Sequence, residues 1–179
     1  MYRKSIERLL LFLVLAMPLA AHALSSDRTK PVNLTADKAK LNNATGVSVY
    51  TGNVVLTQGT LKITGDKLTV YTNKNHQLEK AVVVGNLATY QQLPDGQKQY
   101  VHATAPRMEY YANGPERIRL LDGATLTQGK NRFTGKEVDY NVEKDLVNAT
   151  SGNGGGKRIK ITIYPNKKNT GNESKRADQ

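Results

Sequence analysis

The chain has 179 residues, of which 26 are lysine or arginine and 15 are aspartate or glutamate, and its net charge at pH 7 is +11. It contains no cysteine, which excludes disulfide bonds, zinc sites built from thiolates and cysteine nucleophiles. The excess of positive charge predicts an anionic partner, either nucleic acid or an anionic, phosphorylated lipid.

Residues 1–23 have the composition of a secretory signal peptide. Arg3, Lys4 and Arg8 form a positively charged start. An apolar run, Leu9–Leu15, follows, and the small-residue pattern Ala21-His22-Ala23 precedes the predicted cleavage site. The alternative is a retained membrane anchor, but the apolar run is shorter than the ~20 residues that cross a bilayer. We therefore predict cleavage and export, and an exported chain favours lipids over nucleic acid as the anionic partner.

A seven-residue phrase recurs in the mature chain. It begins with threonine and a small residue and then places apolar residues at alternating positions: TADKAKL at Thr35, TGDKLTV at Thr64, TAPRMEY at Thr104 and TGKEVDY at Thr134. The phrases start 29, 40 and 30 residues apart, and the longest interval contains a turn-forming insertion, Leu93–Lys98. A period of about 30 residues indicates a structural unit that is stacked several times along the chain.

Apolar and polar residues alternate on both sides of the small residue in each phrase, which is the period of a β-strand with one buried face. The alternation shifts by one position at that small residue, so we predict that each strand bends there through a β-bulge. Companion segments at 47–59, 81–92 and 118–129 carry Gly52, Gly85 and Gly123 near their middles. The predicted fold is all-β, a meander of bent antiparallel strands folded into two facing sheets.

The phase of the alternation predicts which side chains face the interior between the two sheets. These inward residues are Val32, Leu34, Leu56, Leu61, Ile63, Leu68, Val70, Tyr90, Val101, Met108, Tyr110, Phe133, Val138 and Tyr140. In an ordinary β-domain such a stripe is a packed core with nothing bound, and that interpretation stays open at this point.

The chain has no recognisable catalytic, metal-binding or cofactor-binding pattern, so we predict neither an enzyme nor a cofactor. His76 in a predicted turn and His102 at an outward strand position are not spaced with carboxylates as zinc ligands are. The segment Ser151–Arg158 lacks the first glycine and the final hydroxyl residue of a phosphate loop, and we interpret it as a linker. Solvated charges are expected at the outward carboxylates Asp66, Glu109 and Asp139.

The last predicted strand is Arg158–Tyr164, in which Ile159, Ile161 and Ile163 alternate with polar residues before Pro165. This strand either closes the fold or offers a free edge to another strand. Residues 165–179 are polar and charged without periodicity, and we predict a disordered, basic tail. The tail either binds an anionic partner or only keeps the chain in solution.

The phrase YTGNVVLTQGTLKITGDKLTVY at Tyr50–Tyr71 follows a signal peptide and a TADKAKL strand. In these features the chain resembles the OstA-like family of periplasmic lipopolysaccharide-transport proteins, over about residues 32–164. The resemblance implies that residues 24–164 form one open, slightly twisted β-jelly roll whose two sheets make a V-shaped groove. Members of the family bridge the inner and outer membranes of Gram-negative bacteria, and the groove shields the acyl chains of lipopolysaccharide. The inward residues named above would then line this groove.

The resemblance also implies partners at the two ends of the jelly roll. LptC is expected at the N-terminal edge, Val32, Asn33 and Leu34, and LptD of the LptD/LptE complex is expected at the C-terminal edge, Ile159, Ile161 and Ile163. Head-to-tail self-association by strand pairing is expected as well, and nucleic acid is not expected. Two alternatives stay open: a structural, self-associating exported β-repeat protein without lipid cargo, and an LptC-like carrier that keeps its N-terminal anchor.

Overall fold

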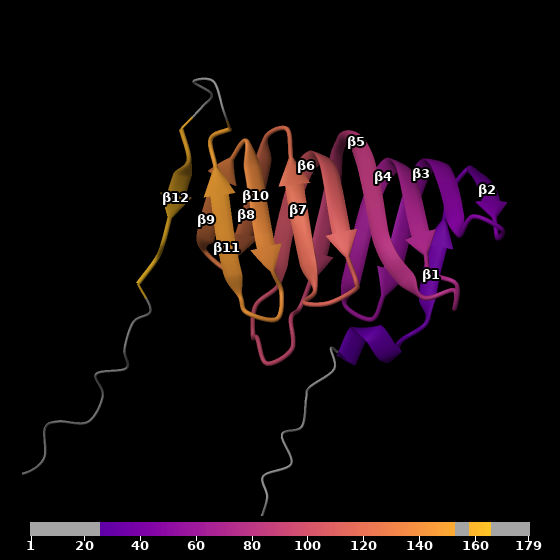
Figure 1. Ribbon diagram of the computed structural model, residues 1–179. Helices are drawn as coiled ribbons and strands as arrows, with labels where there is room; N and C mark the ends of the chain where they lie inside the picture. The colour runs from indigo at the N-terminus through magenta and orange to yellow at the C-terminus, as the bar shows by residue number, and fades with distance from the viewer. Residues whose placement is uncertain (1–25, 153–157, 166–179) are drawn as a thin grey trace, which may run out of the picture.

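The structure, a computed structural model, describes residues 26–152 and 158–165 (Figure 1). The predicted signal peptide, the residues 153–157 of the glycine run and the tail beyond Pro165 lie outside the described residues. No helix within the described ranges is long and apolar enough to cross a membrane. The elements are η1 (Ser26–Thr29), a 3₁₀ turn, followed by the strands β1 (Val32–Thr35), β2 (Lys38–Asn42), β3 (Val47–Gln58), β4 (Leu61–Thr72), β5 (Leu78–Gln92), β6 (Val101–Tyr111), β7 (Arg117–Leu121), β8 (Ala124–Gln128), β9 (Asn131–Gly135), β10 (Glu137–Asn141), β11 (Leu146–Thr150) and β12 (Lys160–Thr162).

All twelve strands belong to one antiparallel sheet that folds over on itself into two layers (Figure 1). The long strands β3 to β6 contribute one half to each layer. Layer 1 contains β2, β7, β10 and β11 with one set of these halves, and layer 2 contains β1, β8, β9 and β12 with the other set. Both layers end in edge strands, which are β1 and β2 at the N-terminal end and β11 and β12 at the C-terminal end. The sequence-based prediction of an open β-jelly roll of bent antiparallel strands is therefore confirmed.

The strands bend where glycine interrupts the apolar alternation. The pairing register shifts between Thr51 and Val54 in β3, between Thr64 and Lys67 in β4, and between Val84 and Ala88 in β5. Gly52 takes a positive φ of 82°, which a residue with a side chain rarely adopts. At Gly65 a Cβ atom would overlap Val83 Cγ2 on the neighbouring strand, so the close approach of two bent strands requires glycine there. We call the line of these bends, where the two layers join, the bend margin.

The recurring threonine of the sequence phrase lies on the outer face of layer 2. The strand register places the outward residues of this layer in one cross-strand row: Thr35, Val55, Thr64, Thr89, Thr104, Thr125, Thr134 and Lys160. Within the row, the hydroxyl oxygens of Thr64 and Thr89 are 2.6 Å apart and share a hydrogen bond. The repeat therefore builds a β-branched polar surface that suits a solvent-facing sheet.

The outer face of layer 1 carries a network of charged side chains rather than threonines. Glu109 accepts hydrogen bonds from Arg107 Nη2 at 2.6 Å, Tyr111 Oη at 2.6 Å and Lys80 Nζ at 3.1 Å. The expectation of a solvated charge was wrong for Glu109, because these neighbours cover it and leave only 6% of the residue exposed. Asp139 is half-buried and lies 3.7 Å from Arg119 Nε.

Candidate functional site

The inner face of layer 2 carries a row of apolar side chains that runs from one edge strand to the other. Antiparallel register places directly opposite residues on the same face of a sheet. Starting in β1 and ending in β12, the row consists of Leu34, Leu56, Ile63, Tyr90, Ala103, Leu126, Phe133 and Ile161. No polar residue interrupts it.

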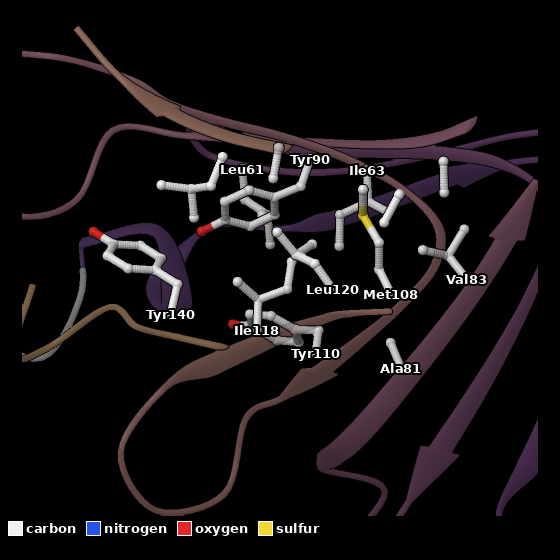
Figure 2. Close-up of a cluster of buried hydrophobic side chains, with 14 of the residues drawn as sticks. Leu61, Ile63, Ala81, Val83, Tyr90, Met108, Tyr110, Ile118, Leu120 and Tyr140 are labelled. Carbon is white, nitrogen blue, oxygen red and sulfur yellow. The ribbon is translucent and has the colours of Figure 1, made fainter. Parts of the chain in front are cut away.

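Layer 1 presents two comparable rows to the same interior. The first row runs from β2 to β11 and consists of Ala39, Tyr50, Leu68, Val83, Met108, Leu120, Val138 and Ala149. The second row consists of Val70, Ala81, Tyr110, Ile118, Tyr140 and Val147. The inner faces of both layers together form a single hydrophobic cluster, and Figure 2 shows its central side chains converging from several strands.

The inward residues predicted from the sequence are mostly brought together in this cluster. The buried ones are Leu56, Leu61, Ile63, Leu68, Tyr90, Val101, Met108, Tyr110, Val138 and Tyr140. Three others, Leu34, Val70 and Phe133, are partly buried and packed against the cluster. Val32 has the inward parity of Leu34, but 55% of it is exposed because β1 is an edge strand at the open N-terminal end.

Apolar side chains on the inner faces are exposed at both ends of the jelly roll. At the N-terminal end these are Val32 and Leu41, which are 55% and 61% exposed. At the C-terminal end Ile161 and Ile163 are 54% and 66% exposed, and Ile161 pairs with the inward Phe133. The interior surface is therefore apolar from end to end, closed by packing in the middle and open at both edges.

Three buried tyrosines point their hydroxyl groups toward the margin opposite the bends, which we call the turn margin (Figure 2). Tyr90 donates a hydrogen bond to Gln92 Oε1, and Tyr140 donates one to Asp145 Oδ1 at 3.0 Å. Burial raises the pKa of Tyr90, Tyr110 and Tyr140, and nearby carboxylates, Glu116 beside Tyr90 and Tyr110 and Asp145 beside Tyr140, raise it further. The rings thus extend the apolar interior as neutral groups.

The segment η1 crosses the turn margin and ties the two layers together. Asp27, only 5% exposed, accepts hydrogen bonds from the Thr60 backbone N–H and from the Thr60 hydroxyl, both at 2.7 Å, in layer 2. Arg28 Nε donates to Glu116 Oε2 at 3.3 Å, and Arg28 Nη2 lies 3.9 Å from Glu143 Oε1, both in layer 1. The sequence did not predict these contacts of Asp27 and Arg28, because their partners are far apart along the chain and follow no periodic pattern.

A second set of contacts bridges the turn margin toward the C-terminal end. Asp145, in the turn between β10 and β11 of layer 1, accepts hydrogen bonds from Gln128 Nε2 at 2.9 Å and Gln97 Nε2 at 3.2 Å in layer 2. These bridges and the contacts of η1 are hydrogen bonds and ion pairs that each involve at least one side chain, whereas the bend margin is continuous backbone. The layers are thus joined permanently on one margin and reversibly on the other.

The described residues contain no group of three or more histidine, aspartate or glutamate side chains arranged to hold a metal ion. His76 lies in an exposed turn with a φ of 59°, and His102 is exposed on the outer face of layer 2, with its ring centroid 6.0 Å from that of Tyr100. The feature that dominates the described part of the chain is therefore the apolar interior with its two open ends.

Comparison with known proteins identifies the family. Residues 33–146 match the family described as LptA/(LptD N-terminal domain) LPS transport protein. The chain belongs to this family. It is 37% identical over 153 residues to the lipopolysaccharide export system protein LptH of Pseudomonas aeruginosa, which covers 83% of this chain and 87% of the relative. It is 31% identical over 154 residues to LptA of Escherichia coli K12, covering 85% and 80%.

A solved structure has the same fold. The crystal structure of Pseudomonas aeruginosa LptH, described as the LptA-homologous periplasmic component of the lipopolysaccharide transport device, superposes with a TM-score of 0.71 at 34% identity. The match covers 78% of this chain and 99% of the other. The family resemblance predicted from the Tyr50–Tyr71 phrase is thus confirmed, as is the β-jelly-roll fold.

Proposed function

We propose that this protein transports lipopolysaccharide across the periplasm by holding the acyl chains against its apolar inner faces. The observation that carries the proposal is the unbroken apolar row from Leu34 in β1 to Ile161 in β12. Its relatives in Pseudomonas aeruginosa and Escherichia coli are named lipopolysaccharide export system proteins, and the LptH structure is described as periplasmic. A site made of aliphatic and aromatic side chains also agrees with a protein that binds and passes on a lipid rather than altering it.

The energetics of lipid transfer explain why such a surface is useful. Each methylene group that leaves water contributes about 0.8 kcal/mol, so a bare acyl chain of about a dozen carbons would cost on the order of 10 kcal/mol to expose. An apolar surface removes this cost along its whole length. Because the rows contain no charged anchor, no single position holds the lipid much more tightly than the next, and the lipid can move along them. The phosphorylated headgroup stays in water outside the layers.

Loading must displace side chains, because the middle of the interior is filled. Leu68, Leu120 and Leu126 have no exposed surface, so an acyl chain enters only when the layers separate. The turn margin is the margin where separation breaks side-chain contacts and leaves the backbone intact. We infer that lipid enters there or through an open end, with the bends acting as the hinge.

The edge strands support the docking of partners at the two ends. Open strand edges with exposed apolar side chains favour pairing with another strand. We propose that LptC of the inner-membrane complex pairs at Val32, Asn33 and Leu34, and that LptD of the LptD/LptE translocon pairs at Ile159, Ile161 and Ile163. Copies of the chain would join head to tail through the same edges. The protein would then form part of a bridge that conducts lipid from the inner to the outer membrane.

The test is lipopolysaccharide loading by the mature protein with a charge placed inside or outside the layers. Ile63 is 3% exposed in the layer 2 row, and its neighbour Lys62 is exposed on the outer face. We expect Ile63→Asp to lose bound lipopolysaccharide in purification and in an exchange assay, whereas Lys62→Asp retains it. Circular dichroism establishes that both variants are folded. Normal loading by folded Ile63→Asp would contradict the proposal.

The filled interior also supports a second candidate function, a structural exported β-repeat protein that self-associates without lipid cargo. That function predicts no lipopolysaccharide uptake by the wild-type protein or by either variant, and association through the edges alone. The N-terminal residue of the mature protein tests the export route shared by both functions, since cleavage after Ala23 leaves Leu24 first. A retained N-terminus would instead support an anchored carrier.

A further inference from the structure

The outer face of layer 2 contains a basic hollow at its C-terminal end. The hollow has a volume of about 720 Å³ and lies between β8, β9 and β12. Its charged lining consists of Arg132, Lys136, Arg158 and Lys160, with Asp122 as the one acidic residue. Hydroxyl groups in the same lining come from Thr125, Thr134 and Thr162.

The positive charge of this hollow is not neutralised by the described residues around it. The arginines on the outer face of layer 1 all have carboxylates within 4 Å: Arg107 with Glu109, and Arg117 and Arg119 with Asp139. No such ion pair joins any of the four hollow cations to a carboxylate in ranges 26–152 and 158–165. Four clustered cations beside the single carboxylate of Asp122 leave the hollow with excess positive charge, and its positive potential favours an anionic partner.

The hollow adjoins the free edge of the sheet. β12 pairs with β9 on one side and has no strand on its other side within the described part of the chain. On this strand, the outward Lys160 and Thr162 alternate with the inward Ile161, and the flanking Arg158 continues the outward series. A strand added at this edge therefore meets isoleucines on its inner face and cations on its outer face.

We propose that β12 pairs with a strand of a partner protein whose inward residues are apolar and whose outward residues are acidic. The cations of the basic hollow bind these acidic residues. This inference rests on the proposed docking at the C-terminal edge and adds the chemistry of the partner. Opposite charges facing each other across paired strands stabilise the pairing. Like charges in the same positions oppose it, so the hollow also excludes basic strands.

Charge argues against a second copy of the chain as the best occupant. Neither β1 nor β2, the strands at the opposite edge, contains an acidic residue. β1, the edge strand in the same layer as β12, contains no charged residue, and Lys38 and Lys40 belong to β2 in layer 1. A second copy docked head to tail through β1 therefore offers the basic hollow no counter-charge, so association between copies should not weaken as the salt concentration rises.

Geometry argues against the phosphates of a carried lipid as the occupant. The hollow lies on the outer face of layer 2, and the apolar row through Leu126, Phe133 and Ile161 lies on the inner face of the same strands. An acyl chain on the inner row and a phosphate in the hollow would sit on opposite sides of one sheet. A single lipid cannot occupy both.

The experiment uses two nine-residue peptides, one alternating valine with glutamate and one alternating valine with lysine, each with a fluorophore. Binding to the mature protein is measured by anisotropy at about 50 mM and about 500 mM NaCl. We expect the glutamate peptide to bind at least about tenfold more tightly than the lysine peptide at low salt, and the difference to shrink at high salt. Arg158→Glu/Lys160→Glu should reverse the preference.

The matched control is Lys62→Glu/Lys67→Glu, the same charge change at exposed positions away from the C-terminal edge, which should keep the wild-type preference. Equal binding of both peptides, or an unchanged preference in Arg158→Glu/Lys160→Glu, would overturn the proposal. Displacement of the glutamate peptide by millimolar inorganic phosphate alone would show a small-anion site and overturn it too. Tighter association between copies than with the glutamate peptide would assign the edge to self-association.

Lipopolysaccharide loading of the same variants separates this inference from the proposed function. Arg158→Glu/Lys160→Glu should load lipid normally while losing the glutamate peptide, and Ile63→Asp should bind the peptide while losing lipid. If Arg158→Glu/Lys160→Glu lost lipid loading and kept the peptide, the hollow would belong to the lipid headgroup and the docking proposal would be wrong.

Discussion

Replacing Glu109 with glutamine tests the charged network on the outer face of layer 1. The carboxylate accepts hydrogen bonds from Arg107, Tyr111 and Lys80, and Lys80 Nζ also lies 4.9 Å from the centre of the Tyr111 ring. Burial by itself raises the pKa of Glu109, but the three hydrogen bonds and the charge of Lys80 outweigh burial and lower it to about 2. The folded protein therefore stabilises the ionised form.

The size of the effect follows from the difference between the pKa values of the unfolded and folded states. A carboxyl whose pKa falls from 4.5 to about 2 on folding contributes about 3 kcal/mol to the free energy of unfolding. Lys80 and Arg107 are 31% and 40% exposed, so solvent screening reduces this to roughly 2 kcal/mol. Because the pKa is lowered, the contribution is complete above pH 4.5 and is lost as the pH falls toward 2.

Urea denaturation of the wild type and Glu109→Gln between pH 7 and pH 2 measures both quantities. We expect the variant to be about 2 kcal/mol less stable at pH 7, with the two stabilities converging below pH 3. Glu137→Gln is the matched control, since Glu137 is 47% exposed and lies 3.7 Å from Arg119; it should change stability by less than about 0.5 kcal/mol. A stability difference for Glu109→Gln that stayed constant down to pH 2 would refute the reasoning.

Three further substitutions test other parts of the structure. Gly65→Ala should lower stability by about 1–3 kcal/mol, because its Cβ would overlap Val83 at the bend margin; an unchanged urea midpoint would contradict the close approach. Leu120→Ala should lower the free energy of unfolding by about 2–5 kcal/mol, since the side chain has no exposed surface. It should leave lipopolysaccharide loading intact, and complete loss of loading in the folded variant would show that one position anchors the lipid. Arg28→Ala should cost about 2 kcal/mol by leaving the buried Glu116 unpaired and should accelerate loading in a stopped-flow assay, whereas slower loading would show that η1 helps lipid to enter.

The strands and their inward faces were predictable because a β-strand has a period of two that local sequence reveals. The bend at Gly65 was also predictable, since the phase of the alternation shifts there, and Gly52 and Gly85 stand near the middles of the companion segments. The outer row of threonines that the repeat builds could not be predicted from the sequence. Only the register between strands places Thr64, Thr89 and Thr104 in one outer row, and register is a property of pairs of segments.

The residues that sequence reasoning misjudged owe their environment to distant partners. Glu109 is covered by Lys80 on the neighbouring strand as well as by Arg107 and Tyr111 on its own. Asp27 is buried by Thr60 and Gln92, which are 33 and 65 positions away. Val32 has the predicted parity but is exposed, because nothing in local alternation shows which strand lies at an edge. The lipid-binding and docking roles of the inner and edge residues stay predictions.

Photo-crosslinking to lipopolysaccharide in cells tests the central proposal most directly. A photoreactive phenylalanine derivative replaces either Tyr110, 5% exposed on an inner row, or Tyr71, an outward tyrosine that is 37% exposed. Both substitutions exchange one aromatic ring for another, so the same photoreactive group probes the inner face in one variant and the outer face in the other. Crosslinks at position 110 without crosslinks at position 71 are expected if lipid travels between the layers. Equal labelling at the two positions, or labelling at position 71 alone, would contradict an apolar interior that carries lipopolysaccharide.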